Sequence, residues 1–259
     1  MRRVWQQTIA TAVAALLGAL AAVGADGPKP AYVRTGALEA KEAVQAAAAD
    51  ERFVYAIDNA SVVKYDRASG KRLAASTGKA EHLNSGFLSD GKLYCAHSNY
   101  PKKPARSEIM VLDPETMALT TFRPFEGDVG SLTWAVRQRG GWWCNFAYYG
   151  DDNAKTYLVK FDDRWAEVGR WTYPQAVLAD LGRYSLSGGL WVDDVLLATG
   201  HDKRVVYRLR LPKEGQVLEL VDVLPSPFPG QGIAPDPKTG GLVGIDRARH
   251  EVVFATLQK

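Results

Sequence analysis

Three of the four histidines stand at the ends of short apolar runs. His82 begins one run, and His97 and His201 each lie just after one. Asp58 and Asp246 end two further runs of the same kind. Imidazole nitrogens bind zinc, manganese, iron and nickel, and three protein ligands with an open position are typical of catalytic metal sites. The pattern therefore predicts a divalent metal centre at His82, His97 and His201, with Asp58 or Asp246 as a further ligand.

The same three histidines are candidate catalytic residues without a metal. An imidazole that titrates near neutral pH can serve as a general acid or base. Arg247 or Arg249 would then hold a substrate carboxylate. The chain contains no His-x-His or His-Glu-x-x-His spacing, so ordinary surface or hydrogen-bonded histidines remain the alternative interpretation.

Other polar residues occupy equivalent places in the chain and are candidates for substrate binding. Most tryptophans are expected in the core, with one or two free to stack on a sugar ring. The candidate substrate-binding residues are Asn84, Asn145, Ser187, Gln231, Arg247 and Trp134. The Gly-x-Ser-x-Gly, Gly-x-Gly-x-x-Gly and phosphate-loop motifs are absent from the sequence, so serine hydrolases of the elbow type and common nucleotide-binding loops have no local support.

The elements that must position these residues are short strands that repeat as a unit. Apolar or alternating runs are separated by Gly, Asp and Asn turns, which is typical of an all-β protein. A long 3.6-residue apolar period occurs only over Glu39 to Ala49. Units begin at residues 82, 131, 185 and 231, which are 49, 54 and 46 residues apart, and a degenerate first unit begins near Glu42. This spacing matches one four-stranded propeller blade.

The two ends of the repeat array are complementary. The last unit ends at its third strand, whereas residues 29–38 precede the first unit and have no other partner. A β-propeller often closes its ring with an N-terminal strand in the last blade, which removes two open sheet edges. We predict an all-β, single-domain, five-bladed β-propeller over residues 26–259. A β-sandwich or two small β domains would not explain five units of similar internal order.

Propeller geometry brings the candidate site residues to one face. The inner strand of each blade starts at one face of the ring and the second strand returns to it, a statement made by analogy at the level of the fold. His82, His97 and His201 are therefore expected at the same face.

Two turns resemble those of bacterial propellers with YVTN, NHL and PQQ-like repeats, namely Leu112-Asp-Pro-Glu-Thr116 and Tyr65-Asp-Arg-Ala-Ser-Gly70. Leu132-Thr-Trp134 and Gly232-Ile-Ala234 resemble segments of the bacterial secreted glutaminyl cyclases, which are five-bladed and of this size. The Glu-Gly-Trp-Gly and Leu-Asn-Glu-Leu-Glu stretches of those enzymes have no counterpart here. The resemblance therefore implies the architecture and does not carry that activity over.

Residues 1–25 have the three parts of a secretory signal peptide: Arg2 and Arg3, an apolar run from Ile9 to Val23, and small residues at the end. The run is shorter than the ~20 residues that a spanning helix needs. Removing residues 1–25 leaves 30 basic and 29 acidic side chains, so the formal net charge falls from +3 to +1. We expect a secreted or periplasmic monomer that has no stable membrane span and does not bind nucleic acid.

Cys95 and Cys144 are the only cysteines. In an exported protein these two cysteines can form one disulfide. Both residues lie in apolar strand-like runs, however, where a free buried cysteine behaves as a small hydrophobe.

Two functions from different classes follow from the sequence. The first is an exported lyase or hydrolase, lactonase-like, that acts on a small or carbohydrate-derived substrate, with a divalent metal as the possible cofactor. The second is a non-catalytic propeller that binds a protein or glycan at the same face. Three imidazoles around one point would favour the enzyme, and scattered imidazoles would favour the binding module.

Overall fold

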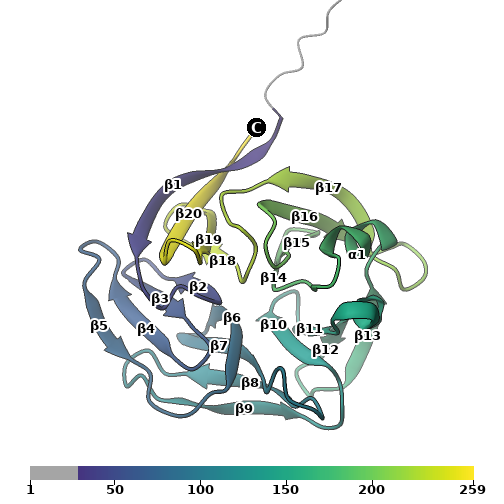
Figure 1. Ribbon diagram of the computed structural model, residues 1–259, viewed down its shortest axis with the longest axis horizontal. Coiled ribbons are helices and arrows are strands. Elements are labelled where there is room, and N and C mark those ends of the chain that lie inside the picture. The colour runs from purple at the N-terminus through teal and green to yellow at the C-terminus, as the bar shows by residue number, and fades with distance from the viewer. Residues whose placement is uncertain (1–28) are drawn as a thin grey trace, which may run out of the picture.

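The computed structural model describes residues 29–259, which form a ring of five four-stranded sheets (Figure 1). Four of these blades are built from consecutive strands. Blade 1 holds β2 (Ala46–Ala49), β3 (Phe53–Ile57), β4 (Val62–Asp66) and β5 (Arg72–Ala75), and blade 2 holds β6 (His82–Ser89), β7 (Lys92–Ser98), β8 (Ser107–Leu112) and β9 (Leu119–Phe125). Blade 3 holds β10 (Ser131–Arg137), β11 (Trp142–Ala147), β12 (Tyr157–Phe161) and β13 (Glu167–Thr172), and blade 4 holds β14 (Gly188–Val192), β15 (Val195–Thr199), β16 (Val205–Arg210) and β17 (Glu219–Pro225).

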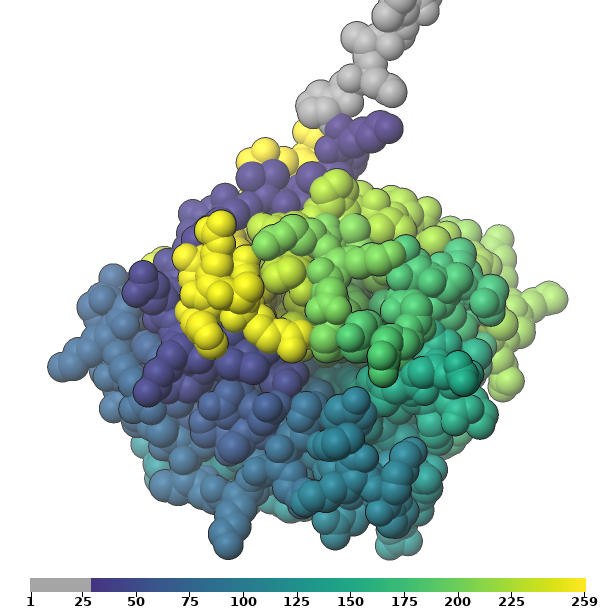
Figure 2. Space-filling model, viewed as in Figure 1, coloured from purple at the N-terminus to yellow at the C-terminus, as the bar shows by residue number. Residues whose placement is uncertain are grey.

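Blade 5 joins the two ends of the described chain. It holds β18 (Ala234–Asp236), β19 (Gly241–Asp246), β20 (Glu251–Gln258) and β1 (Ala31–Glu39). β1 pairs antiparallel with β20 along its length, and the N-terminal and C-terminal segments lie side by side in Figure 2. The predicted five-bladed propeller, closed by an N-terminal strand, is therefore confirmed. The predicted signal peptide and its boundary at residue 25 lie outside the described residues.

Small residues allow the inner strands to meet at the centre of the ring. The segment 39–49, which has the helical apolar period, supplies the buried inner strand β2 instead, because alanine side chains fit the crowded axis. A Cβ added to Gly232 would lie 2.6 Å from the Cβ of Ala46 and 3.2 Å from the Cα of Ser85. One added to Gly189 would lie 2.4 Å from the Trp134 ring. Protein atoms are therefore closely packed at the centre of the ring around Gly232 and Gly189.

A buried ion pair links blade 1 to blade 5. Arg67 follows β4, and both of its terminal nitrogens donate to the Asp236 carboxylate at 2.7 Å. The Asp236 side chain is 0% exposed and that of Arg67 is 7% exposed. The guanidinium also lies over the Phe254 ring of β20, 4.5 Å from its centroid. This contact supplements the strand pairing that closes the ring.

Two short helices accompany the blades. The 3-10 helix η1 (Gly150–Lys155) connects β11 to β12, and α1 (Gln175–Leu181) lies between β13 and β14. Neither Cys95 nor Cys144 forms a disulfide, and both thiols are buried. None of the helices in residues 29–259 has the length and apolar character that a bilayer crossing requires.

Candidate functional site

The strand register places the candidate residues at one face of the ring. The start of each inner strand pairs with the end of the second strand: His82 with Ser98, Ser131 with Ala147, and Gly188 with Thr199. We call this surface the polar face. The helices η1 and α1 connect elements at the same face.

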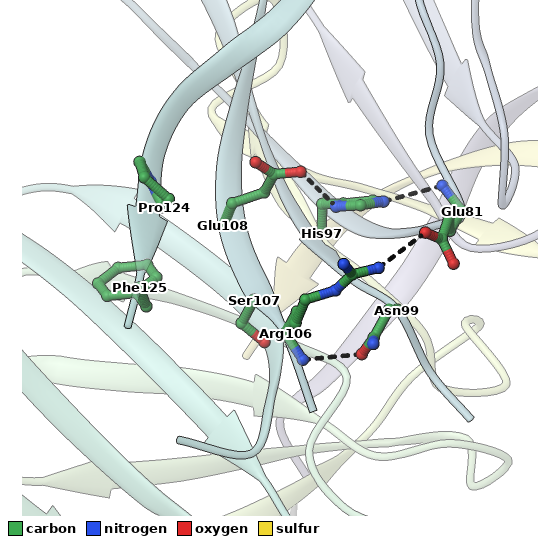
Figure 3. A pocket seen from close by; sticks show the side chains of 8 residues that line it. All are labelled: Glu81, His97, Asn99, Arg106, Ser107, Glu108, Pro124 and Phe125. Atoms are coloured by element: carbon green, nitrogen blue, oxygen red, sulfur yellow. Dashed lines mark hydrogen bonds and ion pairs between the residues drawn. The ribbon is translucent and has the colours of Figure 1, made fainter. Parts of the chain in front are cut away.

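His97 lines a pocket at the rim of blade 2 (Figure 3). The cavity has a volume of about 340 Å³ and is bounded by residues from β7, β8, β9 and the segment before β6. Its lining residues are Glu81, His97, Asn99, Arg106, Ser107, Glu108, Pro124 and Phe125. A second cavity of about 520 Å³ shares Glu81, His97 and Glu108 with it.

Both ring nitrogens of His97 lie close to polar groups of the protein. The backbone N–H of Glu81 donates to Nε2 at 2.8 Å, so this nitrogen carries no proton. The Glu108 carboxylate lies 3.0 Å from Nδ1. The hydrogen bond from His97 is the main reason that the pKa of Glu108 is below its ordinary value. His97 therefore links the segment before β6 to the second and third strands of blade 2.

His201 has a different environment, between blades 4 and 5. Its Nδ1 lies 2.8 Å from Asp202, and its Nε2 lies 3.4 Å from an Nη nitrogen of Arg247. The Tyr184 ring stacks on the imidazole, with centroids 4.1 Å apart and planes 5° apart. The side chains of His201 and Arg247 are 31% and 35% exposed. This group places a carboxylate and a cation beside one imidazole that is accessible to solvent.

His82 belongs to an aromatic group at blades 2 and 3. Its ring lies 5.4 Å from that of Tyr100, which lies 4.9 Å from that of Tyr149. Burial, with a contribution from the charge of His97, lowers the pKa of His82 below its ordinary value. The contacts of His82 and His97 lie in blades 2 and 3, and those of His201 in blades 4 and 5. The three imidazoles thus form two groups rather than one.

The two predicted aspartate ligands form hydrogen bonds within their own turns or with arginines. Asp58 accepts backbone N–H groups of Ala60 and Ser61, both at 2.7 Å. The Asp246 carboxylate accepts a hydrogen bond from the Arg204 guanidinium at 2.9 Å. Within residues 29–259, no group of three or more His, Cys, Asp or Glu side chains is placed to hold a metal ion. The described chain does not assemble the five predicted ligands into a centre, because their donor atoms face separate partners.

Two predicted substrate-binding residues are hydrogen-bonded to other protein groups inside the ring. Asn84 donates to the carbonyl of Leu132 at 2.9 Å. Asn145 is 0% exposed, donates to Thr133 and accepts the Tyr173 hydroxyl.

Trp134 and Gln231 are also buried, whereas Ser187 keeps partial exposure. Gln231 donates to the carbonyl of His201 at 2.8 Å and so supports that loop. The Trp134 ring is 0% exposed and packs against Gly189, so in this structure it lies in the core. Of the predicted substrate-binding residues, Arg247 and Ser187 are half-buried and reach the surface.

Tyr100, Tyr184, Glu81 and Glu108 were not selected from the sequence as site residues. Their partners come from other strands or other blades, and no local spacing reveals them. One signal in the sequence is the long connection between Ser98 and Ser107, which carries Tyr100.

Comparison with known proteins supports the fold. No family model matches this chain, and no curated protein matches it either. Among solved structures, a glutaminyl cyclase of Myxococcus xanthus is similar, with a TM-score of 0.60 and 12% identity over 88% of this chain and 97% of that chain. A chain of a mitotic checkpoint complex matches with a TM-score of 0.45 and 12% identity, over 96% of this chain and 100% of that chain. Likeness at 12% identity shows the fold alone, and this chain is a five-bladed β-propeller.

Proposed function

We propose that this protein is an exported enzyme that performs acid–base chemistry on a small, carboxylate-bearing, carbohydrate-derived substrate at the polar face, as a lyase or a lactonase-like hydrolase. The observation that supports it is the position of His201 between Asp202 and Arg247, 2.8 Å and 3.4 Å from its two ring nitrogens. The predicted signal peptide supports export.

The position of Asp202 suggests which nitrogen acts as the base. We infer that the carboxylate 2.8 Å from Nδ1 favours the tautomer with the proton on Nδ1 and the lone pair on Nε2. Arg247 faces the same Nε2. An incoming carboxylate would pair with Arg247 and lie next to the base, since a guanidinium binds carboxylates through parallel N–H groups.

This arrangement suits removal of the proton next to a carboxylate. Pairing with Arg247 would stabilise the negative charge that builds up on the substrate as His201 takes the proton. In the lyase reaction the C–H electron pair forms a C=C bond while the neighbouring C–O bond breaks, and the leaving oxygen takes up a proton. In the hydrolase reaction Nε2 removes a proton from water as the water oxygen attacks the lactone carbonyl. The ring C–O bond to the carbonyl then breaks, and the leaving oxygen takes the proton from His201, which gives a hydroxy acid.

The test is a panel of uronic acids, their lactones and aromatic acids incubated with the purified protein. A lyase product is detected by the ultraviolet absorbance of its new conjugated double bond, and hydrolysis by acid release. His201→Gln should lower kcat by about 10²–10⁴-fold, the contribution of a general base, and Arg247→Met should raise KM. His250→Gln is the matched control, because His250 sits at an exposed turn. Absence of turnover across the panel, or unchanged activity in His201→Gln, would overturn the proposal.

The second candidate is a non-catalytic propeller that binds a protein or glycan at this face. The separation of the imidazoles into two groups favours it. The same panel distinguishes the two functions: saturable binding without any product would identify the binding module.

A further inference from the structure

A further cavity on the polar face lies between blades 2 and 3, apart from the contacts of His201. Its volume is about 160 Å³, and its walls include Tyr100, Lys103, Ser131, Tyr149 and Asp152. A cavity of about 150 Å³ holds one benzene molecule. This cavity is therefore the size of a single six-membered ring.

Aromatic side chains supply one wall of the cavity. Tyr100 is 43% exposed although it is large and apolar in body. Its ring is held between those of His82 and Tyr149, at 5.4 Å and 4.9 Å. Burial raises the pKa of Tyr149 above its ordinary value, although a hydrogen bond with Ser131 opposes the shift. The partly exposed Tyr100 ring, braced by its two aromatic neighbours, is a stacking platform.

The rim of the cavity offers both donors and acceptors. Lys102 pairs with Glu81, and Asp152 pairs with Lys155 at 2.8 Å. Paired charges of both signs around an aromatic wall suit a ring that carries several hydroxyl groups, since hydroxyls donate and accept hydrogen bonds.

The backbone joins this cavity to the His201 site. Gly150, the residue after Tyr149, donates its N–H to the carbonyl of Arg183 at 2.8 Å. The residue after Arg183 is Tyr184, which stacks on His201. The two sites therefore lie on loops that are hydrogen-bonded to each other on one face.

We propose that the cavity between Tyr100 and Tyr149 is a sugar subsite that binds the ring adjacent to the carboxylate-bearing residue, so that the substrate is an acidic oligosaccharide. This inference rests on the proposed function, which assigns the carboxylate to Arg247.

The test compares galacturonic acid with its dimer and trimer, using calorimetry on the full chain. The dimer should bind at least about tenfold more tightly than the monomer, which is about 1.4 kcal/mol. Tyr100→Ala should abolish this gain and leave the monomer affinity unchanged, while Tyr100→Phe keeps the gain because the platform is retained. Phe122→Ala is the matched control: Phe122 is 41% exposed on β9, the outer strand of blade 2.

Different outcomes separate the two proposals. Equal affinity for monomer and dimer in the wild-type protein overturns the subsite and leaves the proposed function standing. A gain that survives in Tyr100→Ala also overturns the subsite. Binding of a neutral oligosaccharide that depends on Tyr100 but not on Arg247 supports the subsite and overturns the carboxylate role of Arg247.

Discussion

The buried Arg67–Asp236 pair makes a quantitative prediction about ring closure. Arg67→Met removes the guanidinium and leaves the Asp236 carboxylate, which is 0% exposed, without its two 2.7 Å hydrogen bonds. Removal of one partner from a buried pair costs about 3–5 kcal/mol, because a buried charge is left unpaired. Thr239 still donates to the carboxylate at 2.7 Å, so we expect a loss near the lower end, about 3 kcal/mol.

The loss should depend on pH. Burial alone would raise the pKa of Asp236, but hydrogen bonds from Arg67 and Thr239 outweigh it and hold the pKa below its ordinary value. In the wild-type protein the ionised carboxylate therefore adds stability above the unfolded-state pKa of about 3.9, and this is lost only as the pH falls through the lower folded-state value. Without Arg67, burial raises the pKa, and acidification neutralises the stranded charge. The difference in unfolding free energy between the two proteins should shrink from pH 7 to about pH 4.

The assay is urea unfolding followed by tryptophan fluorescence at both pH values, since the chain has seven tryptophans. Arg34→Met is the matched control, in blade 5 with Asp236: its pair with Glu251 is 3.0 Å long but 40% exposed on the arginine side. An exposed pair contributes about 0.2–1 kcal/mol. The reasoning is refuted if Arg67→Met costs no more than Arg34→Met, or if its cost is the same at pH 7 and pH 4.

Three further predictions concern packing and titration. Gly189→Ala should lower the free energy of unfolding in urea by about 1–3 kcal/mol, because the new methyl group overlaps the indole ring of Trp134. Gly36→Ala is the control: the nearest atom to its new methyl group is 3.8 Å away, so the change should stay within about 0.5 kcal/mol. Equal losses in the two variants would contradict close packing at the centre of the ring. Burial raises the pKa of the Cys95 thiol to about 12 and raises that of Cys144 further, so Ellman's reagent at pH 8 should label neither thiol until urea is added. Burial lowers the pKa of His82, so the folded protein is destabilised as the pH falls below the unfolded-state pKa of about 6.5. The free energy of unfolding of His82→Gln should therefore decrease less between pH 7 and pH 5 than that of the wild-type protein. An identical pH profile for the two proteins would contradict this.

The architecture was predictable from the sequence because a propeller repeats one local unit. Turn residues and apolar runs recur at the blade spacing, and the incomplete last unit needs the strand formed by residues 31–39. The inner strand β2 was harder to place, since four consecutive alanines fit a helix as well as a strand. Their burial at the crowded axis, a property of the whole ring, determines the outcome.

The candidate site was predictable only in part, because partner choice depends on other blades. Repeat position brought His82, His97 and His201 to one face. It did not show that a backbone N–H occupies Nε2 of His97, or that Tyr184 covers one side of His201. Trp134 illustrates the same limit: the sequence made it a candidate for substrate binding, whereas its ring packs inward against Gly189 of the next blade.

The pairing of β1 with β20 also constrains the order in which the ring can close. Ala31 lies opposite Gln258, so β1 gains its sheet partner only when β20 has reached it. Until then β1 and β19 both present unpaired edges, which are templates for association with other chains. Each of blades 1 to 4 is built from consecutive strands and can form from local contacts, whereas blade 5 needs a contact between strands far apart in the sequence, which forms more slowly.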